Sequence, residues 1–404
     1  MPSPNSPTDS LRDAAALPPA VPAAPGYLLV DRELSDLRGN VLRPADDAAE
    51  LDPIAVQPAS VDLRLGPTAW RVRCGFLPGS SPVEARLEEL GASQLSLEGE
   101  GAVLERGQVY LVPLQEALEL PPTLSARFNP RSSTGRCDIF TRVLCEGHPR
   151  FDEAPAGFRG RLWLEIAPLS FPVRLRRGDR LCQVRIAKGR ARLNADEVRA
   201  AYARTPLCFL DEEGRERPLR LDDEVRVDDE GGLLLSVSLE GRDPAGWRAA
   251  RHTGIVRFSD EDAHAPDEFF EPVRARQGRT ILTPGSFYIF VSRERLRIPP
   301  DLAAEMLPVD VGIGELRNNY AGFFDNGFGW AEDQEGTPRE RGTPAVLEVR
   351  AHDVPFLVED GQVFFRLTLF RTSGRPAALY GEGRASYRNQ DLTLARCFHK
   401  GPTS

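Results

Sequence analysis

The chain has 404 residues, which leaves room for two domains with substantial hydrophobic cores. Hydrophobic residues make up 41% and charged residues 27%, as is typical of a globular protein, and the formal net charge of −9 argues against a broad nucleic-acid surface. No apolar run reaches the ~18 residues that a membrane helix requires. We therefore expect neither nucleic acid nor a membrane as a partner.

Residues 1–24 are rich in Pro, Ala and Ser and predict a disordered tail. Beyond it, the 35 glycines and 35 prolines favour many short strands joined by turns. Residues 61–65, 69–74 and 172–176 alternate apolar and polar side chains as half-buried strands do. Apolar residues on one face predict a short helix near 82–90. The sequence therefore predicts an all-β fold with few short helices.

The chain contains an internal repeat. Residues 107–111 (GQVYL) return as 285–289 (GSFYI), and 118–126 (LELPPTLSA) return as 296–304 (LRIPPDLAA) at the same spacing. Matches in a fixed order at a constant spacing indicate a tandem duplication.

The duplication predicts two tandem domains, each a β-sandwich or β-barrel. We place the first domain at 25–210 and the second at 233–404. The acidic, glycine-containing stretch at 211–232 is the expected junction, with a surface loop inside one domain as the alternative.

A hydroxyl- and arginine-rich hexapeptide follows Asn129-Pro130. Glycine lets the backbone approach a ligand, hydroxyl and N–H groups donate hydrogen bonds, and arginine supplies bidentate charge, so the motif suits a phosphate chain. A solvated turn is the alternative reading. The second half carries 309–314 (VDVGIG) at the matching place, so only the first half is expected to hold a triphosphate. The motif consists of Arg131, Ser132, Ser133, Thr134, Gly135 and Arg136.

Two glutamates occupy equivalent positions inside apolar strands, Glu165 in LWLEI and Glu348 in AVLEV. Such a carboxylate either lies on an exposed edge or sits in a pocket that raises its pKa, and a raised pKa suits general acid–base catalysis. Asp325, and more loosely Asp152, follow a phenylalanine in glycine-bearing turns. Each aspartate could hold a sugar hydroxyl or belong to an ordinary hairpin turn.

These residues, in this order, resemble the dCTP deaminase branch of the dUTPase superfamily, over nearly the whole chain after the tail. The resemblance implies two dUTPase-like, distorted, jelly-roll-like β-barrels. Residues 131–136 look like the family's phosphate motif. Asp325, followed by Val346, Leu347 and Glu348, looks like its nucleoside loop and catalytic strand. Tyr380 and residues 385–390, which end in Gln390, look like the C-terminal segment that closes over substrate, although Ser386 stands where the family has a lysine.

The activity that the resemblance implies is hydrolytic deamination of dCTP to dUTP and ammonia. A glutamate would take the proton from a water that attacks cytosine C4 and pass it to the leaving ammonia, while Arg136 and Ser132 help to position that water. Zinc is not expected, because the five histidines lack the H-x-E and P-C-x-x-C partners of zinc deaminases. Mg²⁺ would be bound through the triphosphate oxygens.

Family sites form between barrels, so we expect a homo-oligomer. The hexapeptide could meet Asp325 and Glu348 of a second-half barrel, or Asp152 and Glu165 of another first-half barrel. We favour Glu348 slightly. The six cysteines form no C-x-x-C pair and are expected to be reduced thiols in a cytoplasmic protein.

Two other functions stay open at this point. One is a dUTP diphosphatase, or a bifunctional enzyme that takes dCTP to dUMP, with Asp152 or Asp325 directing water at the α-phosphate. The other is a non-catalytic nucleotide-binding regulator.

Overall fold

The computed structural model describes residues 25–46, 48–77, 79, 81–309, 316–318, 322–332, 338–339, 342–351, 353–382 and 390–399. The expected tail at 1–24, the expected loss of a phosphate motif at 310–314 and the expected role of Ser386 lie outside these residues.

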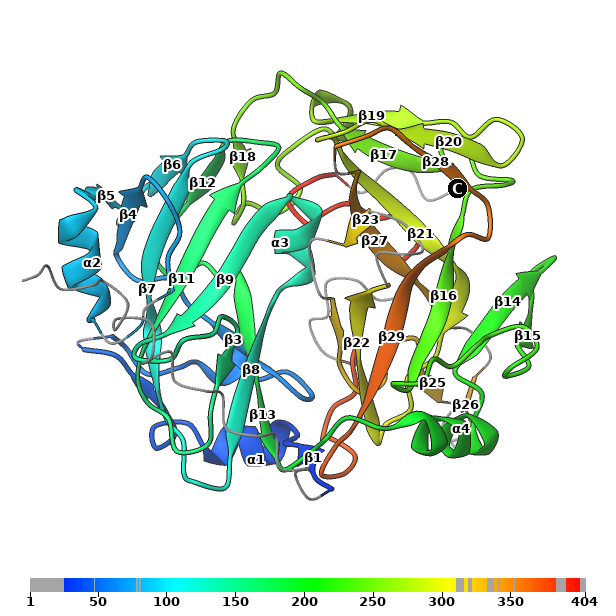
Figure 1. Cartoon of the computed structure of the whole chain (residues 1–404), viewed down its shortest axis with the longest axis horizontal. Helices are drawn as coiled ribbons and strands as arrows, with labels where there is room; N and C mark the ends of the chain where they lie inside the picture. Colours follow the sequence, from blue (N-terminus) through cyan, green and yellow to red (C-terminus); the bar gives the residue numbers. More distant parts are fainter. Residues whose placement is uncertain are drawn as a thin grey trace, which may run out of the picture.

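The first half forms two facing sheets, seen in blue to green in Figure 1. One has the order β5-β4-β7-β11-β9, with β2 on β7; the other has the order β1-β13-β8-β10, with β3 on β13. Their bounds are β1 (Tyr27–Leu28), β2 (Leu42–Pro44), β3 (Val61–Leu63), β4 (Thr68–Val72), β5 (Ser93–Ser96), β7 (Val109–Glu119), β8 (Ser125–Pro130), β9 (Ile139–Cys145), β10 (Glu153–Ala154), β11 (Arg159–Pro168) and β13 (Cys182–Lys188). Alternate residues of β11 (Leu162, Leu164, Ile166) enter the core between the sheets, as the period of two in a strand dictates.

The second half repeats the pairings of the first. β27 (Thr343–Ala351) pairs with β21 (Phe287–Leu296) as β11 pairs with β7, and β29 (Val363–Arg371) pairs with β22 (Leu302–Pro308) as β13 pairs with β8. Around them lie β16 (Gly232–Ser238), β17 (Gly246–Ala249), β19 (Phe270–Val273), β23 (Leu316–Asn318) and β24 (Phe323–Phe324). The fold is therefore all-β and tandem, as predicted.

The stretch expected to be the junction contributes to the second-half sheet. β14 (Cys208–Glu212) overlaps the start of that stretch, and β15 (Arg215–Pro218) lies within it. The two strands form a hairpin, and β14 also pairs with β21. The other strands of the described residues form three small sheets: β6 (Ala102–Leu104) with β12 (Val173–Leu175) and β18 (Val256–Arg257); β20 (Arg279–Leu282) with β28 (Phe356–Glu359); and β25 (Ala331–Glu332) with β26 (Pro338–Arg339).

The helices of the described residues are short: α1 (Asp31–Asp36), α2 (Val83–Glu89), α3 (Ser132–Arg136) and α4 (Ala195–Arg204), with 3₁₀ turns at Pro53–Ala55 and Pro266–Glu268. The helix expected near 82–90 is α2, whose Val83 and Leu87 are buried against Trp163 of β11. None of the described helices is long and apolar enough to span a bilayer. All six cysteines are free thiols.

A segment of the second half crosses onto the first half and joins their cores. β18 runs parallel to β12 of the first half, and Figure 1 shows them side by side. The ring of Phe171 lies 5.7 Å from Phe269 and 5.3 Å from Phe270, both edge to face, and Phe398 packs edge to face on Phe269 and Phe270 in turn. Each such pair stabilises the fold by about 0.5–1.5 kcal/mol beyond the effect of burying its apolar surface. This aromatic cluster holds the two halves in one fixed arrangement.

Candidate active site

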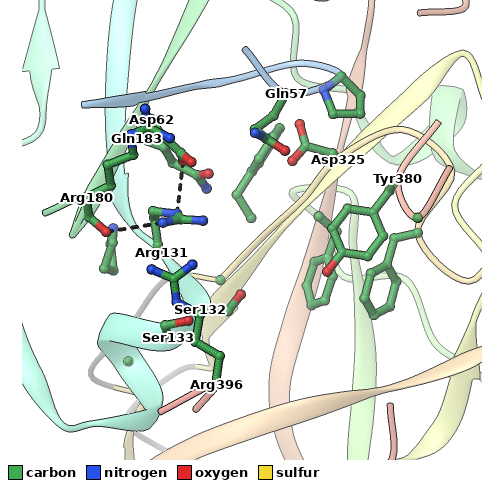
Figure 2. Close-up of a pocket in the computed structure, with 18 of the residues that line it drawn as sticks. Gln57, Asp62, Arg131, Ser132, Ser133, Arg180, Gln183, Asp325, Tyr380 and Arg396 are labelled. Atoms are coloured by element: carbon green, nitrogen blue, oxygen red, sulfur yellow. Dashed lines mark hydrogen bonds and ion pairs between the residues drawn. The ribbon is translucent and has the colours of Figure 1, made fainter. Parts of the chain in front are cut away.

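A cavity of about 770 Å³ opens between the two halves of the chain. The first half contributes α3 and the adjacent strands, and the second half contributes residues around Asp325, Glu348 and Tyr380. Figure 2 shows Arg131, Ser132, Ser133 and Arg396 on one side of the cavity and Asp325 and Tyr380 on the other. The cavity therefore has a cationic, hydroxyl-bearing side and an aromatic, acidic side.

The hexapeptide forms α3 directly after β8. The carbonyl of Arg131 accepts from the N–H groups of Thr134 (2.9 Å) and Gly135 (3.1 Å), which closes the first turn. The Thr134 hydroxyl donates to the carbonyl of Leu181 (2.7 Å) and is buried, so it fixes the helix and does not line the cavity. Ser132, Ser133, Gly135 and Arg136 do line it.

Arg131 is oriented by a buried carboxylate. Its Nε lies 3.0 Å from Asp62 Oδ1, and its Nη1 donates to the carbonyl of Arg180 (3.3 Å). Burial raises the pKa of Asp62, and the charge of Arg131 opposes that shift. Arg136, Arg180 and Arg396 line the same cavity, as do the carboxylates of Asp179 and Glu261. The site therefore offers several guanidiniums to a polyanionic ligand.

Glu348 lies on the face of β27 that looks into this cavity. Its cross-strand neighbour on β21 is the apolar Ile289, and its charged neighbour is Arg136 of the other half, whose Nε lies 4.0 Å from Glu348 Oε1. Burial raises the pKa of Glu348 to about 7, and Arg136 opposes the rise. A carboxyl group with this pKa can both accept and return a proton near neutral pH.

The C-terminal segment fixes Arg136. The Arg136 guanidinium donates to Gln390 Oε1 and to the carbonyl of Thr393 (2.9 Å). Gln390 Nε2 in turn donates to the carbonyl of Pro344 at the start of β27 (3.2 Å). Gln390 thus connects α3 to the strand that carries Glu348. Val346, two residues before Glu348 and on the same face, also lines the cavity, whereas Leu347 points into the second-half core.

The opposite side of the cavity carries Asp325 beside aromatic rings. Asp325 Oδ1 accepts from the N–H of Ala59 (2.8 Å) and lies 3.4 Å from the Ser60 hydroxyl, and burial raises its pKa to about 7. The rings of Phe328 and Tyr380 lie 5.5 Å apart, and the N–H of Tyr380 donates to the carbonyl of Asn326 (2.8 Å). A planar base and a sugar hydroxyl match these groups.

The first-half counterparts lie away from the cavity. Glu165 Oε1 accepts from Arg142 Nε (2.9 Å) and Nη2 (2.6 Å), and a Cβ on Gly75 would come within 2.2 Å of Glu165 Oε2. Asp152 Oδ1 accepts from the N–H of Val143 (2.7 Å) in its own half. The structure thus brings Arg131, Ser132, Ser133, Arg136, Asp325, Glu348, Tyr380 and Gln390 together and leaves Glu165 and Asp152 outside.

Several cavity residues were not anticipated from the sequence, namely Gln57, Asp62, Arg180, Gln183 and Arg396. Asp62 had a usable signal, because it is the one position of SVDL (60–63) that differs in the matching SVSL (236–239). Arg396 follows the last repeated motif, so comparison of the two halves gives no information about it. Among the described residues, no group of three or more His, Cys, Asp or Glu side chains is placed to hold a metal ion.

Comparison with known proteins agrees with this layout. Two family models match: the 2'-deoxycytidine 5'-triphosphate deaminase N-terminal domain over residues 30–190 and its C-terminal domain over residues 210–398. The curated relatives include a dCTP deaminase of Halorubrum lacusprofundi (34% identical; 36% of this chain, 67% of that protein). They also include a dUMP-forming dCTP deaminase of Coprothermobacter proteolyticus (34% identical; 38% of this chain, 76% of that protein).

Among solved structures, the 2'-deoxycytidine 5'-triphosphate deaminase of Agrobacterium tumefaciens superposes with a TM-score of 0.76 at 42% identity, over 87% of this chain and all of that one. The first half supplies Arg131, Ser132 and Ser133 and the second half supplies the buried Glu348, within a fold shared across the length of that structure. The chain is an enzyme of the dCTP deaminase family.

Proposed function

We propose that the chain hydrolyses dCTP to dUTP and ammonia in the cavity between its two halves. The observation that carries the proposal is the position of Glu348, a buried carboxyl group 4.0 Å from Arg136 in a cavity lined by arginine and serine side chains. The triphosphate would bind on the side of Arg131, Ser132 and Ser133. The nucleoside would then extend toward Asp325 and Tyr380.

In the proposed reaction, ionised Glu348 accepts a proton from a water that attacks cytosine C4. The resulting tetrahedral intermediate carries the new hydroxyl and the amino group on C4. Glu348 returns the proton to the amino group, the C4–N bond breaks, and ammonia leaves. Transfer of the hydroxyl proton to N3 then gives the C4 carbonyl of the uracil ring. Arg136 and Ser132 are proposed to position the water, and the low polarity around Glu348 supports proton transfer near neutral pH.

The proton transfers in this scheme are assigned to Glu348, so the reaction is proposed to need no zinc. Mg²⁺ would enter with the substrate, bound by its triphosphate oxygens. Activity that survives a zinc-selective chelator in the presence of Mg²⁺ is the expected result, and loss of activity that added Zn²⁺ restores would contradict this part of the proposal.

A second candidate is conversion of dCTP to dUMP in one site, since the Coprothermobacter relative is named dUMP-forming. That reaction needs a carboxylate that directs water at the α-phosphate, and of Asp152 and Asp325 only Asp325 lines the cavity.

The test is incubation of the purified chain with dCTP and Mg²⁺, followed by measurement of ammonia, dUTP, dUMP and pyrophosphate together. Equal amounts of ammonia and dUTP are expected. Ammonia with dUMP and pyrophosphate would support the bifunctional reaction. Absence of all four products would overturn both reactions, and absence of dUTP turnover as well would leave a non-catalytic nucleotide-binding protein.

A further inference from the structure

Arg396 places a guanidinium in the cavity from the C-terminal segment. It lines the cavity with Arg131, Ser132 and Ser133, and Figure 2 shows it on the same side as these three residues, opposite Asp325 and Tyr380. The same segment supplies Gln390, which contacts Arg136. Residues 390–396 therefore reach the cationic side of the cavity at two points.

The backbone of Arg396 is held in place before any ligand binds. Its carbonyl accepts from the N–H of Asp262 (3.0 Å), and the carbonyl of Cys397 accepts from the N–H groups of Ala263 (2.9 Å) and His264 (3.0 Å). The next residue, Phe398, is buried in the aromatic cluster that joins the two halves. Binding of a ligand therefore has to order the Arg396 side chain but not the backbone that carries it.

Arg131, Arg136 and Arg396 each form an ion pair with a different carboxylate. Arg131 faces Asp62 and Arg136 faces Glu348, and both carboxylates are buried. Arg396 pairs with Glu261 at 3.5 Å, and the Glu261 side chain is 70% exposed. The charge of Arg396 also acts on Asp62 and Asp179, where it opposes the rise in pKa that burial causes. An exposed ion pair such as that between Arg396 and Glu261 is weak, so a multiply charged phosphate chain can replace it.

We infer that Arg396 binds the triphosphate of the substrate, and that Glu261 competes with the triphosphate for its guanidinium. This inference rests on the proposed function, because it places the triphosphate on the side of Arg131, Ser132 and Ser133. It makes the phosphate site a joint product of α3 and the C-terminal segment. It also predicts that the preference for a triphosphate over a monophosphate depends on Arg396.

The experiment measures the affinity for dCTP and dCMP by calorimetry in a chain carrying Glu348→Gln, so that nucleotide is not consumed. Four further substitutions are introduced into that chain one at a time: Arg396→Gln, Arg396→Lys, Glu261→Gln and, as a matched control, Arg257→Gln. Arg257 pairs with Asp260 (3.1 Å), donates to the carbonyl of Ala263 (3.0 Å) in the loop that holds the Arg396 backbone, and does not line the cavity. Thermal unfolding of each variant verifies that it is folded.

With Arg396→Gln, the Kd for dCTP should rise by about tenfold or more, as expected for loss of a charge-assisted contact, while the Kd for dCMP changes by less than about twofold. Arg396→Lys should fall in between, because it keeps the charge but not the fork of donors. Glu261→Gln should leave dCTP binding unchanged or tighten it by up to about fivefold. Arg257→Gln should change neither affinity.

Three results would overturn the inference. One is an Arg396→Gln chain that binds dCTP as tightly as its parent. Another is equal weakening for dCTP and dCMP. The third is a Glu261→Gln chain that loses dCTP affinity as Arg396→Gln does, since the pair would then merely anchor the segment. If the intact chain neither binds nor deaminates dCTP, the proposed function fails and the inference fails with it.

Discussion

Replacing Glu348 by glutamine should stabilise the folded protein at pH 8 even as it removes the proposed general base. Burial raises the pKa of Glu348 from its ordinary value of 4.5 to about 7. The folded chain therefore binds more protons than the unfolded chain between these values, and the stability of the wild type falls as pH rises through that window and levels off above it. At 1.36 kcal/mol for each pH unit, the ionised carboxylate costs the folded state about 3 kcal/mol at pH 8.

Glutamine has nearly the same shape and no charge, so the variant should recover most of that cost. Its advantage should shrink to less than about 1 kcal/mol at pH 5, where the wild-type carboxyl group is largely protonated in the folded state. The assay is urea unfolding followed by tryptophan fluorescence at both pH values, with comparison of the midpoints. The urea midpoints are compared directly, because a chain with two cores need not unfold in the single step that an extrapolated free energy assumes.

The equivalent carboxylate of the first half provides the control. Glu165 is paired with Arg142 at 2.6 Å, and the Arg142 side chain is 33% exposed. Glu165→Gln leaves this half-buried guanidinium without its carboxylate and should destabilise the protein by about 1–3 kcal/mol. Opposite signs for the two variants at pH 8 are the expected outcome. A loss of stability in both variants would refute the reasoning, since it would mean that Glu348 is held by its surroundings as firmly as Glu165 is.

Three further predictions follow from the same geometry. The rate of dCTP deamination should rise with pH up to about 7 and then level off, because Glu348 must be ionised to accept a proton; a rate that is constant from pH 6 to pH 8 would contradict this. Asp31 accepts from the N–H groups of Ala377 (2.9 Å) and Ala378 (3.1 Å) and so holds the loop leading to Tyr380. Asp31→Ala should therefore raise the KM for dCTP severalfold, and an unchanged KM in steady-state kinetics would contradict a role of Asp31 in placing Tyr380. Gly75→Ala would bring a Cβ within 2.2 Å of Glu165 and should lower the unfolding free energy by about 1–3 kcal/mol. The kcat for dCTP should stay unchanged, and a large fall in kcat would indicate that the Glu165 region takes part in catalysis.

The fold was accessible from the sequence because its signals are local and repeated. Alternation of apolar and polar residues identified strands such as β3 and β4, and the echo of 107–111 in 285–289 identified β7 and β21 as equivalent strands. The hexapeptide at 131–136 contains the residues that a phosphate site needs within one turn of chain. These features depend on neighbours a few residues apart, which a single sequence displays.

The division of labour between the two glutamates was not accessible in the same way. LWLEI and AVLEV look alike, and what separates them is contributed from elsewhere in the chain. Glu165 is paired by Arg142 on the neighbouring strand and approached by Gly75, whereas Glu348 faces Arg136 of the other half. Register and the packing of distant segments decide these contacts, and neither follows from the local pattern.

The crossing of the second half onto the first was equally hidden. Residues 241–268 gave no clear pattern, yet β18 within them pairs with β12, and Phe269 and Phe398 enter the first-half core. This crossing places the two halves so that α3 faces β27. The cavity consequently takes its cationic side and its buried glutamate from a single chain, while the expectation of a homo-oligomer stays a prediction.

The most direct test of the account is a comparison of dCTP deamination by the wild type, Glu348→Gln and Glu165→Gln in the presence of Mg²⁺, with ammonia and dUTP measured over time. Glu348→Gln is expected to abolish both products, and folded Glu165→Gln is expected to retain most of the wild-type rate. Activity that is lost in Glu165→Gln but kept in Glu348→Gln would contradict it, and would assign the chemistry to the first half.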